Sequence, residues 1–319
     1  MPYLEGVDVG FLFLAASAVL LVAGSELFAE HAGAAGRRFG VTALAIGLVL
    51  AGAEPEEMVT AIFASARHLP GVAAGDAIGA NVTMLTVVLG LAAIARPFKL
   101  GNRVRSYAFA AAAAGVIAAI ALTGGHVGRI AGAFLVGAYA VAVAVVWRRE
   151  RRPPAFGEAA EIEEHEDDGD TPVSHDTRAA ALVVLGVGLM TAGGWLAVSG
   201  AERIVTSLGF AQSVVGLTFV ALATTAELFA LVWAAFRRGV EELAIAGVLG
   251  SALYNATATL GLAALVRPLV VTGIGWQAWL AAALPVGLII MAAMGQRVGR
   301  VGGGLLVAMY GLFLGLTFR

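Results

Sequence analysis

The sequence predicts an all-α polytopic membrane protein of ten transmembrane helices, built as two inverted five-helix repeats in which helices 2 and 7 are broken. Three observations carry this prediction. The 319-residue chain is 60% hydrophobic and 13% charged, whereas a soluble domain carries about 25% charged residues. Ten apolar runs are each long enough to cross a bilayer, which takes about 20 residues. The two halves of the chain also resemble each other.

The ten apolar runs follow one another with short connections, so lipid rather than water is expected to surround them. The second and seventh runs are longer than one crossing needs and contain polar clusters, as expected of broken helices that line a site. The predicted spans are 9–29, 40–66, 72–95, 106–123, 127–147, 179–200, 210–236, 243–266, 274–295 and 301–318.

A single segment, 148–178, has the composition of a soluble stretch. It opens with four arginines and two prolines and then becomes strongly acidic. This composition predicts a flexible linker between a first membrane repeat, 1–147, and a second, 179–319. A cation-sensing role for the acidic run is the less favoured alternative, because no spacing in it matches a calcium-binding loop.

The basic residues predict the orientation of the chain. With ten spans, the loops after helices 1, 3, 5, 7 and 9 share one side, and they hold 15 of the 20 Lys and Arg residues. Cytoplasmic loops carry the excess of basic residues. We therefore expect a multi-pass protein of the cell membrane with both termini outside and the 148–178 linker in the cytoplasm.

Several function classes find no support in the sequence. The net charge of −2 indicates no nucleic-acid partner. Nothing matches the phosphate-binding loop G-x-x-x-x-G-K-[ST], so no nucleotide is expected as an energy source. The chain contains no cysteine, which excludes disulfides and thiol chemistry. The apolar composition makes the lipid bilayer the expected partner of the chain, and no pattern indicates an oligomeric state.

An internal repeat relates the two halves. LGLAAIARPF (89–98) and LGLAALVRPL (260–269) are identical at seven of ten positions, at an offset of 171. The same offset pairs Gly79 with Gly250 and Glu56 with Glu227. Five spans per half is an odd number, so the second half must enter the membrane from the opposite side. Inverted repeats place a substrate site near the bilayer midplane, between discontinuous helices.

Carboxylates interrupt both long apolar segments. Glu227 lies in GLTFVALATTAELF (216–229), and Glu54, Glu56 and Glu57 lie in AGAEPEEMVTAIFASA (51–66). A carboxylate in so apolar a segment costs several kcal/mol unless something binds it or protonates it. We interpret these groups as functional. Asp76 is instead expected to begin a helix, where a carboxylate suits the positive end of the dipole.

The motifs around these residues resemble those of the cation/calcium exchanger superfamily, which includes sodium/calcium and cation/proton antiporters. The resemblance covers both halves in order. Its elements in this chain are GSELF (24–28), Gly216-Leu217-Thr218, Ala223-Thr224-Thr225-Ala226-Glu227 and Gly250-Ser251-Ala252-Leu253-Tyr254-Asn255.

The resemblance implies two facing glutamates, one per half, in an oxygen-only site completed by hydroxyls, amides and carbonyls. Calcium suits such a site, because it takes 6–8 oxygen ligands at about 2.3–2.6 Å. The implied function is transport of inorganic cations, without a cofactor and without enzymatic chemistry. The candidate metal ligands are Glu54, Glu56, Glu57, Asn81, Thr224, Thr225, Glu227, Ser251 and Asn255.

The first half departs from the family pattern. Ala53 and Ala80 stand where the family has hydroxyl residues, and Met84 stands where it has an amide or acid. The family's glutamate is also ambiguous: a spacing of 22 residues before Gly79 selects Glu57, which we favour, whereas the internal repeat selects Glu56. Because the resemblance implies sodium sites that use hydroxyl and amide oxygens from both halves, the losses favour a proton as the coupling ion.

Together these features predict a secondary-active antiporter that exchanges calcium, or another hard cation, against protons or sodium by alternating access. Two alternatives stay open. One is a sodium/proton antiporter on the same fold. The other is a membrane protein that kept the scaffold but lost transport with part of its site.

Overall fold

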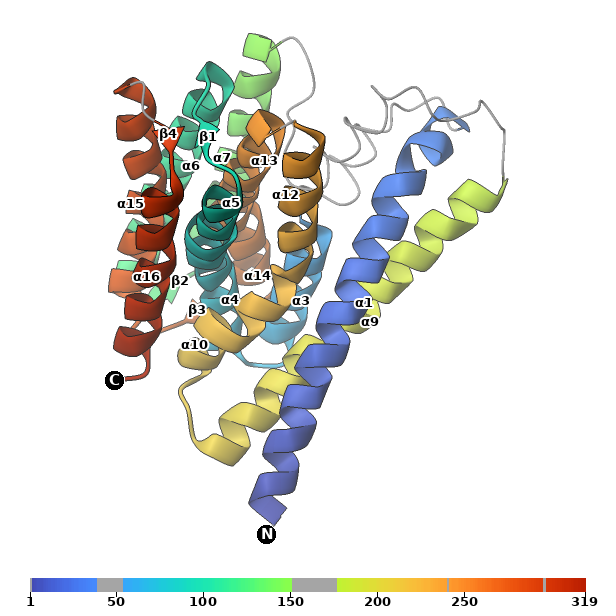
Figure 1. Cartoon of the computed structure of the whole chain (residues 1–319). Coiled ribbons are helices and arrows are strands. Elements are labelled where there is room, and N and C mark those ends of the chain that lie inside the picture. Colours follow the sequence, from blue (N-terminus) through green and yellow to red (C-terminus); the bar gives the residue numbers. More distant parts are fainter. Residues whose placement is uncertain (1, 39–53, 151–176, 240, 295–296) are drawn as a thin grey trace.

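The computed structural model describes residues 2–38, 54–150, 177–239, 241–294 and 297–319, and almost all of them are helical (Figure 1). Within these residues, eight helices are long and apolar enough to cross a membrane, or nine if one bent pair counts as a single span. Of the predicted span 40–66, only the part from residue 54 onward is described. The predicted linker lies almost entirely outside the described residues.

The described elements fall into two series. The first comprises α1 (Pro2–Arg38), α3 (Pro55–Ala66), α4 (Pro70–Thr83), the π-helix η2 (Met84–Val88), α5 (Leu89–Ala95), β1 (Phe98–Lys99), α6 (Asn102–Thr123), β2 (His126–Val127) and α7 (Arg129–Glu150). The second comprises α9 (Thr177–Leu208), α10 (Gln212–Val215), the π-helix η3 (Gly216–Val220), α11 (Ala221–Thr224), α12 (Ala226–Arg238), α13 (Glu241–Tyr254), the π-helix η4 (Asn255–Thr259), α14 (Leu260–Val266), β3 (Leu269–Val270), α15 (Gly275–Ala293), β4 (Arg297–Val298) and α16 (Arg300–Thr317).

The element boundaries recur along the chain with a fixed offset. Pro70–Thr83, Met84–Val88 and Leu89–Ala95 become Glu241–Tyr254, Asn255–Thr259 and Leu260–Val266, in each case 171 residues later. The strands β1 and β2 recur as β3 and β4 at the same offset. The internal similarity of the sequence therefore corresponds to a repeated order of structural elements.

Two short strand pairs join the series to each other. β1 pairs antiparallel with β4, with Phe98 opposite Val298, and β2 pairs antiparallel with β3, with Val127 opposite Leu269. The sequence predicts helices only, so these two-residue strands are an addition to the predicted fold. Each pair lies in a connection between helices, where backbone groups would otherwise lack partners.

The centre of the bundle consists of the run from α4 through α5 and its counterpart from α13 through α14, both of which are buried along most of their length. Glycines let α4 approach its neighbour closely. A side-chain carbon at Gly79 would overlap the backbone of Leu217 in η3, and one at Gly75 would come within 2.8 Å of the Ser213 carbonyl. Small residues permit such contact between backbones inside a membrane. The close contact brings Asp76, between these glycines, next to the second series.

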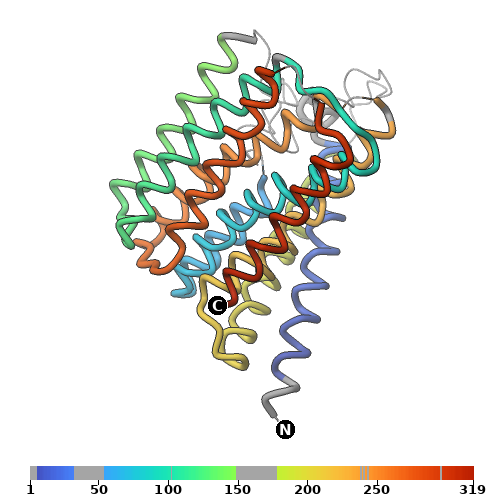
Figure 2. The backbone as a smooth tube through the Cα atoms, turned by 60° about the vertical axis from the view of Figure 1, so that its left-hand side comes forward, coloured from blue at the N-terminus to red at the C-terminus, as the bar shows by residue number. Residues whose placement is uncertain are grey.

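The helices α1 and α9 lie side by side and slant away from the rest of the bundle (Figures 1 and 2). Both extend beyond the predicted spans 9–29 and 179–200, because α1 has 37 residues and α9 has 32. At 1.5 Å per residue they are about 56 and 48 Å long, whereas the hydrocarbon core is about 30 Å thick. A helix this long fits by tilting or by leaving the bilayer.

The predicted break in helix 7 is present. The helix bends by 42° between Gln212–Thr224 and Ala226–Arg237, and Glu227 lies in the first turn after the bend. In the other long segment, α3 begins at Pro55 directly after Glu54, whose backbone is not helical. Proline suits the first turn of a helix. Both acidic clusters therefore lie at helix N-termini, where the dipole favours negative charge.

Candidate cation-binding site

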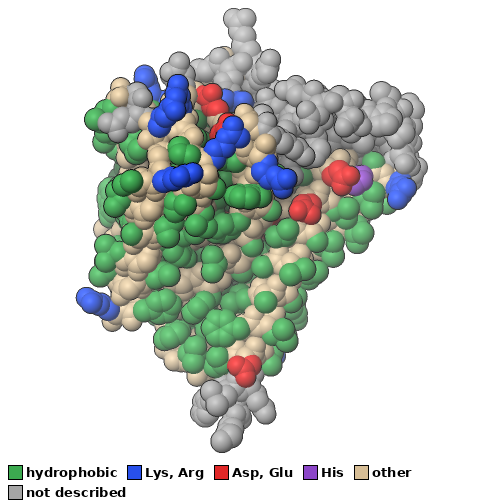
Figure 3. Space-filling model, viewed as in Figure 1, with side chains coloured by type: hydrophobic (Ala, Val, Ile, Leu, Met, Phe, Trp, Pro, Cys, Tyr) green, Lys and Arg blue, Asp and Glu red, His purple; other side chains and the backbone are tan. Residues whose placement is uncertain are grey.

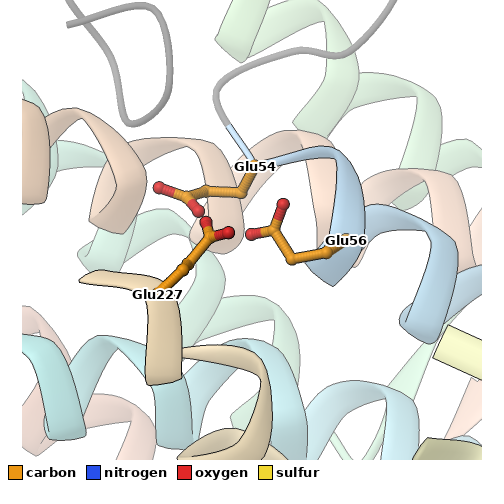
Figure 4. Close-up of side chains that lie close together, drawn as sticks. All are labelled: Glu54, Glu56 and Glu227. Atoms are coloured by element: carbon orange, nitrogen blue, oxygen red, sulfur yellow. The ribbon is translucent and has the colours of Figure 1, made fainter. Parts of the chain in front are cut away.

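Three buried carboxylates meet between α3 and α12. One oxygen each of Glu54, Glu56 and Glu227 lies within 4.8 Å of the other two. The carboxylates point toward one another from the starts of the two helices (Figure 4). Glu54 and Glu56 are fully buried, and Glu227 is 7% exposed. The second and seventh predicted spans, which are far apart in the sequence, thus supply one cluster.

The cluster has the chemistry of a site for a hard cation. Three carboxylates this close in a buried site cannot all be ionised without a compensating charge. Because the cluster consists only of carboxylates, a divalent cation or protons can supply that charge. Calcium prefers carboxylate and carbonyl oxygens, and the cluster offers six carboxylate oxygens.

Ser251 on α13 connects the second series to this cluster. Its hydroxyl donates a hydrogen bond to Oε1 of Glu54 and lies 3.1 Å from the Gly247 carbonyl. At the offset of 171, Glu54 corresponds to Thr225. The first half therefore carries a carboxylate where the second carries a hydroxyl, which explains why the cluster holds three acids rather than two.

Asp76 is a fourth buried acid at this site, and the interpretation of it as a helix start was wrong. α4 begins at Pro70, so Asp76 lies in the middle of the helix and is fully buried. Its Oδ1 accepts a hydrogen bond from Thr224, 3.0 Å away, immediately before the bend in helix 7. The signal was available in the sequence: an ionisable residue inside an apolar span indicates function, as argued for Glu227.

Glu57 lies outside the three-carboxylate cluster, although it is fully buried. Neither of its carboxylate oxygens accepts a hydrogen bond from the described residues. The sequence left Glu56 and Glu57 as alternatives for the family's glutamate. The structure brings Glu56 to Glu227 and leaves Glu57 buried outside this cluster.

The predicted amides are buried between the two series. The Asn81 Nδ2 donates to the carbonyl of Ala252, 2.9 Å away, which is the residue that corresponds to Asn81 at the offset of 171. The Asn255 Oδ1 accepts a hydrogen bond of 3.2 Å from Thr259. Asn81 thus holds its amide oxygen in place through a bond to the other half.

The two threonines at the bend use their protons in hydrogen bonds. The Thr225 hydroxyl donates a hydrogen bond to the carbonyl of Ala221 at 2.7 Å. The Thr224 hydroxyl lies within hydrogen-bond distance of Oδ1 of Asp76 and of two backbone carbonyls of its own helix. A hydroxyl whose proton is engaged in this way keeps its lone pairs available to a cation. Both threonines are fully buried.

Several buried oxygens of the site accept no hydrogen bond within the described part of the chain. They are Oε2 of Glu54, Oε1 and Oε2 of Glu57, Oδ2 of Asp76, Oδ1 of Asn81 and Oε2 of Glu227. Native proteins pair more than about 90% of their buried polar groups, so six such oxygens in one region require a reason. They are the groups that a bound cation or a proton would satisfy.

A cavity of about 210 Å³ reaches Glu227 from the side of α1. Ser25 and Glu26 line it from α1, and Ala230, Leu231 and Ala234 line it from α12. Glu26 is exposed. The GSELF motif therefore lies beside the site, and the cavity joins Glu227 to Ser25 and Glu26 of this motif.

Comparison with known proteins identifies the family. The family described as sodium/calcium exchanger protein matches residues 9–148 and 178–319. This chain belongs to the sodium/calcium exchanger family. The two matched ranges leave out the predicted linker and cover both halves of the membrane region.

Relatives of this exchanger extend over nearly its full length. The putative antiporter CaxA of Alkalimonas amylolytica is 26% identical over 316 residues, covering 95% of this chain and 96% of the relative. The inner membrane protein YrbG of Escherichia coli strain K12 is 26% identical over 318 residues, covering 96% and 93%. A structure of the sodium-calcium exchanger NCX_Mj, soaked with 10 mM Na⁺ and no Ca²⁺, superposes with a TM-score of 0.63 at 25% identity, covering 96% and 98%.

Membership in this exchanger family has direct consequences. The family consists of cation antiporters rather than enzymes, and it transports cations without cofactors. The chain is a membrane protein with multiple apolar spans. Within this family, a buried carboxylate cluster between two helix N-termini is a candidate cation site.

Proposed function

We propose that this exchanger moves calcium, or another hard cation, across the membrane against protons or sodium by alternating access. One observation carries the proposal. Glu54 and Glu56 from the first half and Glu227 from the second form a buried cluster of carboxylates that requires positive charge. The transported cation is the substrate of this site.

The remaining buried polar groups complete the proposed ligand set. Ser251 orients Glu54, and Thr224 orients Asp76. Asn81 and Asp76 each hold an oxygen that accepts no hydrogen bond from the described residues. The proposed ligands are Glu54, Glu56, Glu57, Asn81, Thr224, Thr225, Glu227, Ser251 and Asn255, to which we add Asp76.

The charge of the site gives a physical reason for strict exchange. In alternating access, the protein switches between a state open to one side of the membrane and a state open to the other. If the empty site kept several ionised carboxylates, their charge would be surrounded by apolar side chains during this switch. Moving unpaired charge through a low-dielectric region costs many kcal/mol. The switch has a low free-energy cost only when a cation or protons occupy the site. The protein therefore switches with one ion bound and returns only after the other ion has bound.

The proposed architecture is ten helices in two inverted halves. The constant offset between the element boundaries supports the repeat, and the odd number of spans in each half supports the inversion. The first half is 1–147, the linker 148–178 and the second half 179–319. The distribution of basic residues supports external termini and a cytoplasmic linker.

Protons are the favoured coupling ion. Ala80 and Met84 are fully buried beside Asn81 and offer no oxygen from their side chains, whereas Asp76 adds a carboxylate. A sodium site of neutral oxygens would depend on the second half alone. A proton needs only a carboxylate, and the first half supplies four acids, Glu54, Glu56, Glu57 and Asp76.

Calcium uptake into liposomes tests the proposal. Purified protein is reconstituted with calcium outside, and an outward gradient of sodium or of protons is applied in turn. Uptake that requires one of these gradients supports calcium exchange. Sodium flux driven by a pH step without calcium uptake would instead establish the sodium/proton alternative. The absence of calorimetric heat with sodium, calcium and magnesium would favour a scaffold that no longer transports.

A further inference from the structure

A polar cavity lies at the end of the molecule where β1 and β4 pair. It measures about 620 Å³ and is lined by four basic side chains and two carboxylates, a net charge of +2. In Figure 3, Lys and Arg side chains gather at the end where Figure 1 shows β1 and β4, above a largely apolar surface. The charged lining residues are Arg96, Lys99, Arg103, Glu241, Glu242 and Arg297.

An apolar groove adjoins this charged cavity, which we call the headgroup cavity. The groove measures about 480 Å³ and is formed by α5 and α12, with Leu91 and Trp233 among its lining residues. Both side chains are about half exposed, at 46% and 56%. Arg96 lines the cavity and the groove alike, so the two hollows meet at a guanidinium group.

The two carboxylates of the cavity are already engaged by protein groups. Arg96 forms an ion pair with Glu241 at 3.1 Å and donates to the Phe236 carbonyl at 2.7 Å. Glu242 accepts a hydrogen bond of 3.3 Å from the backbone N–H of Arg103. These contacts fix the wall of the cavity, and they reduce the ability of the acids to neutralise other cations.

We assign Lys99 and Arg297 to a ligand, because Arg96 pairs with Glu241 and the guanidinium of Arg103 lies over the ring of Tyr107, 5.9 Å from its centroid. Lys99 and Arg297 lie opposite each other in the β1–β4 pair. None of the ion pairs among the described residues includes either of them. Two adjacent cations without a carboxylate partner match the charge of a phosphate, which accepts strong charge-assisted hydrogen bonds.

The corresponding end of the molecule has a different chemistry. At the offset of 171, Lys99 corresponds to Val270 and Arg297 to His126, and these two residues form the β2–β3 pair. Glu241 corresponds to Pro70. The bias of basic residues toward the cytoplasm explains a difference in charge between the ends. It does not explain a charged cavity that continues into an apolar groove.

We propose that the headgroup cavity and the α5–α12 groove together bind one anionic phospholipid. The phosphate would lie against Lys99 and Arg297, and an acyl chain would follow the groove past Leu91 and Trp233. Basic pockets beside transmembrane helices suit anionic lipid headgroups. The lipid would contact both halves of the exchanger, because β1 and α5 belong to the first and β4 and α12 to the second.

Native mass spectrometry of the detergent-solubilised, full-length protein tests this site. Phosphatidylglycerol and phosphatidylcholine with identical acyl chains serve as the probes. We expect phosphatidylglycerol to bind more tightly. Replacing both cations, in Lys99→Ala with Arg297→Ala, should weaken its binding roughly thirtyfold, since each basic residue contributes about 1 kcal/mol. Lys99→Gln alone should cause a smaller loss of phosphatidylglycerol binding. This single variant replaces the double variant in the test if the double variant does not fold.

Two further variants sharpen the test. Ala95→Trp fills the groove without changing charge and should also weaken phosphatidylglycerol binding. Arg129→Ala with Arg319→Ala removes two exposed cations elsewhere on the surface and should leave binding unchanged. Equal binding of both lipids, or an equal loss in this control, would overturn the proposal. If glycerol phosphate competes fully with phosphatidylglycerol and Ala95→Trp has no effect, the cavity binds a free anion. That result would also contradict the proposed lipid site.

Discussion

The Thr224 hydroxyl donates a hydrogen bond of 3.0 Å to Oδ1 of Asp76, and this bond joins the end of α11 to the middle of α4. It connects the two halves at the bend of helix 7, three residues before Glu227. The position of the Glu227 carboxylate therefore depends on a contact between two residues that lie outside the three-carboxylate cluster.

Loss of this bond should reduce stability. Thr224→Val leaves Asp76 buried without its donor, which costs about 1–3 kcal/mol. Thermal unfolding in detergent, followed by circular dichroism, measures the loss. Thr206→Val is the matched control, because the Thr206 hydroxyl contacts only its own helix backbone and is exposed. An equal loss in both variants would show that the bond to Asp76 contributes nothing.

Glu227→Gln should abolish calcium transport while the protein stays folded. The substitution keeps the shape of the side chain and removes its charge. The lost attraction to a divalent cation is worth several kcal/mol, so binding should weaken by orders of magnitude. Flux in liposomes measures transport, and Glu30→Gln on the exposed face of α1 is the control. Near-normal flux in Glu227→Gln would remove this residue from the proposed site.

A pH step alone should drive calcium uptake with sodium absent on both sides. The clustered acids cannot all be ionised when the site is empty, so protons bind as calcium leaves and depart as calcium binds. Acidification on the side of calcium entry should therefore slow uptake, because protons compete for the same oxygens. Flux that requires sodium and ignores the pH step would mean that Thr224, Thr225, Ser251 and Asn255 suffice for a sodium site.

Close packing of α4 should make Gly79 intolerant of a side chain. In Gly79→Ala the added carbon would overlap the Leu217 backbone, and overpacking of this kind costs about 1–3 kcal/mol. Gly137→Ala is the matched control, since nothing lies within 4 Å of the position that its side chain would take. Alanine stabilises a helix interior by roughly 0.5–1 kcal/mol relative to glycine, so the two variants should shift the unfolding temperature in opposite directions.

The orientation can be measured by labelling single cysteines, because the chain contains none of its own. Ser174→Cys in the linker should react with a membrane-impermeant maleimide only after the cytoplasmic side is opened. Arg319→Cys at the C-terminus should react in intact cells. The reverse pattern would show that the positions of the basic residues were misinterpreted.

The apolar runs predicted the helices, because a segment that crosses a bilayer must be long and apolar. The internal repeat predicted the recurring order of the elements, because the two segments still resemble each other in sequence. The carboxylates were predicted from their cost in an apolar segment. Asp76 was missed because its place in the run resembled the start of a helix, whereas Pro70 begins it. The choice between Glu56 and Glu57 could not be made from spacing, since adjacent residues on a helix point about 100° apart.

The short strands and the π-helices had no signal in the sequence. A two-residue strand is too brief to show alternation of apolar and polar residues, and the π-helices differ from the neighbouring α-helix only in their hydrogen bonds. The helices α1 and α9 are longer than predicted because they continue past the apolar runs into segments with charged residues, where hydropathy gives no signal of a helix.

The pairing of β1 with β4 and of β2 with β3 determines when the two halves can complete their folding during synthesis of the chain. Neither strand of the first half has a partner within that half. When translation has reached only α7, these strands are unpaired, Asn81 lacks the carbonyl of Ala252, and Glu54 lacks Ser251. The newly made first half thus holds Glu54 and Asp76 without the hydroxyls of Ser251 and Thr224 until the second half is inserted. The carboxylate site is therefore completed only after the second half has been inserted.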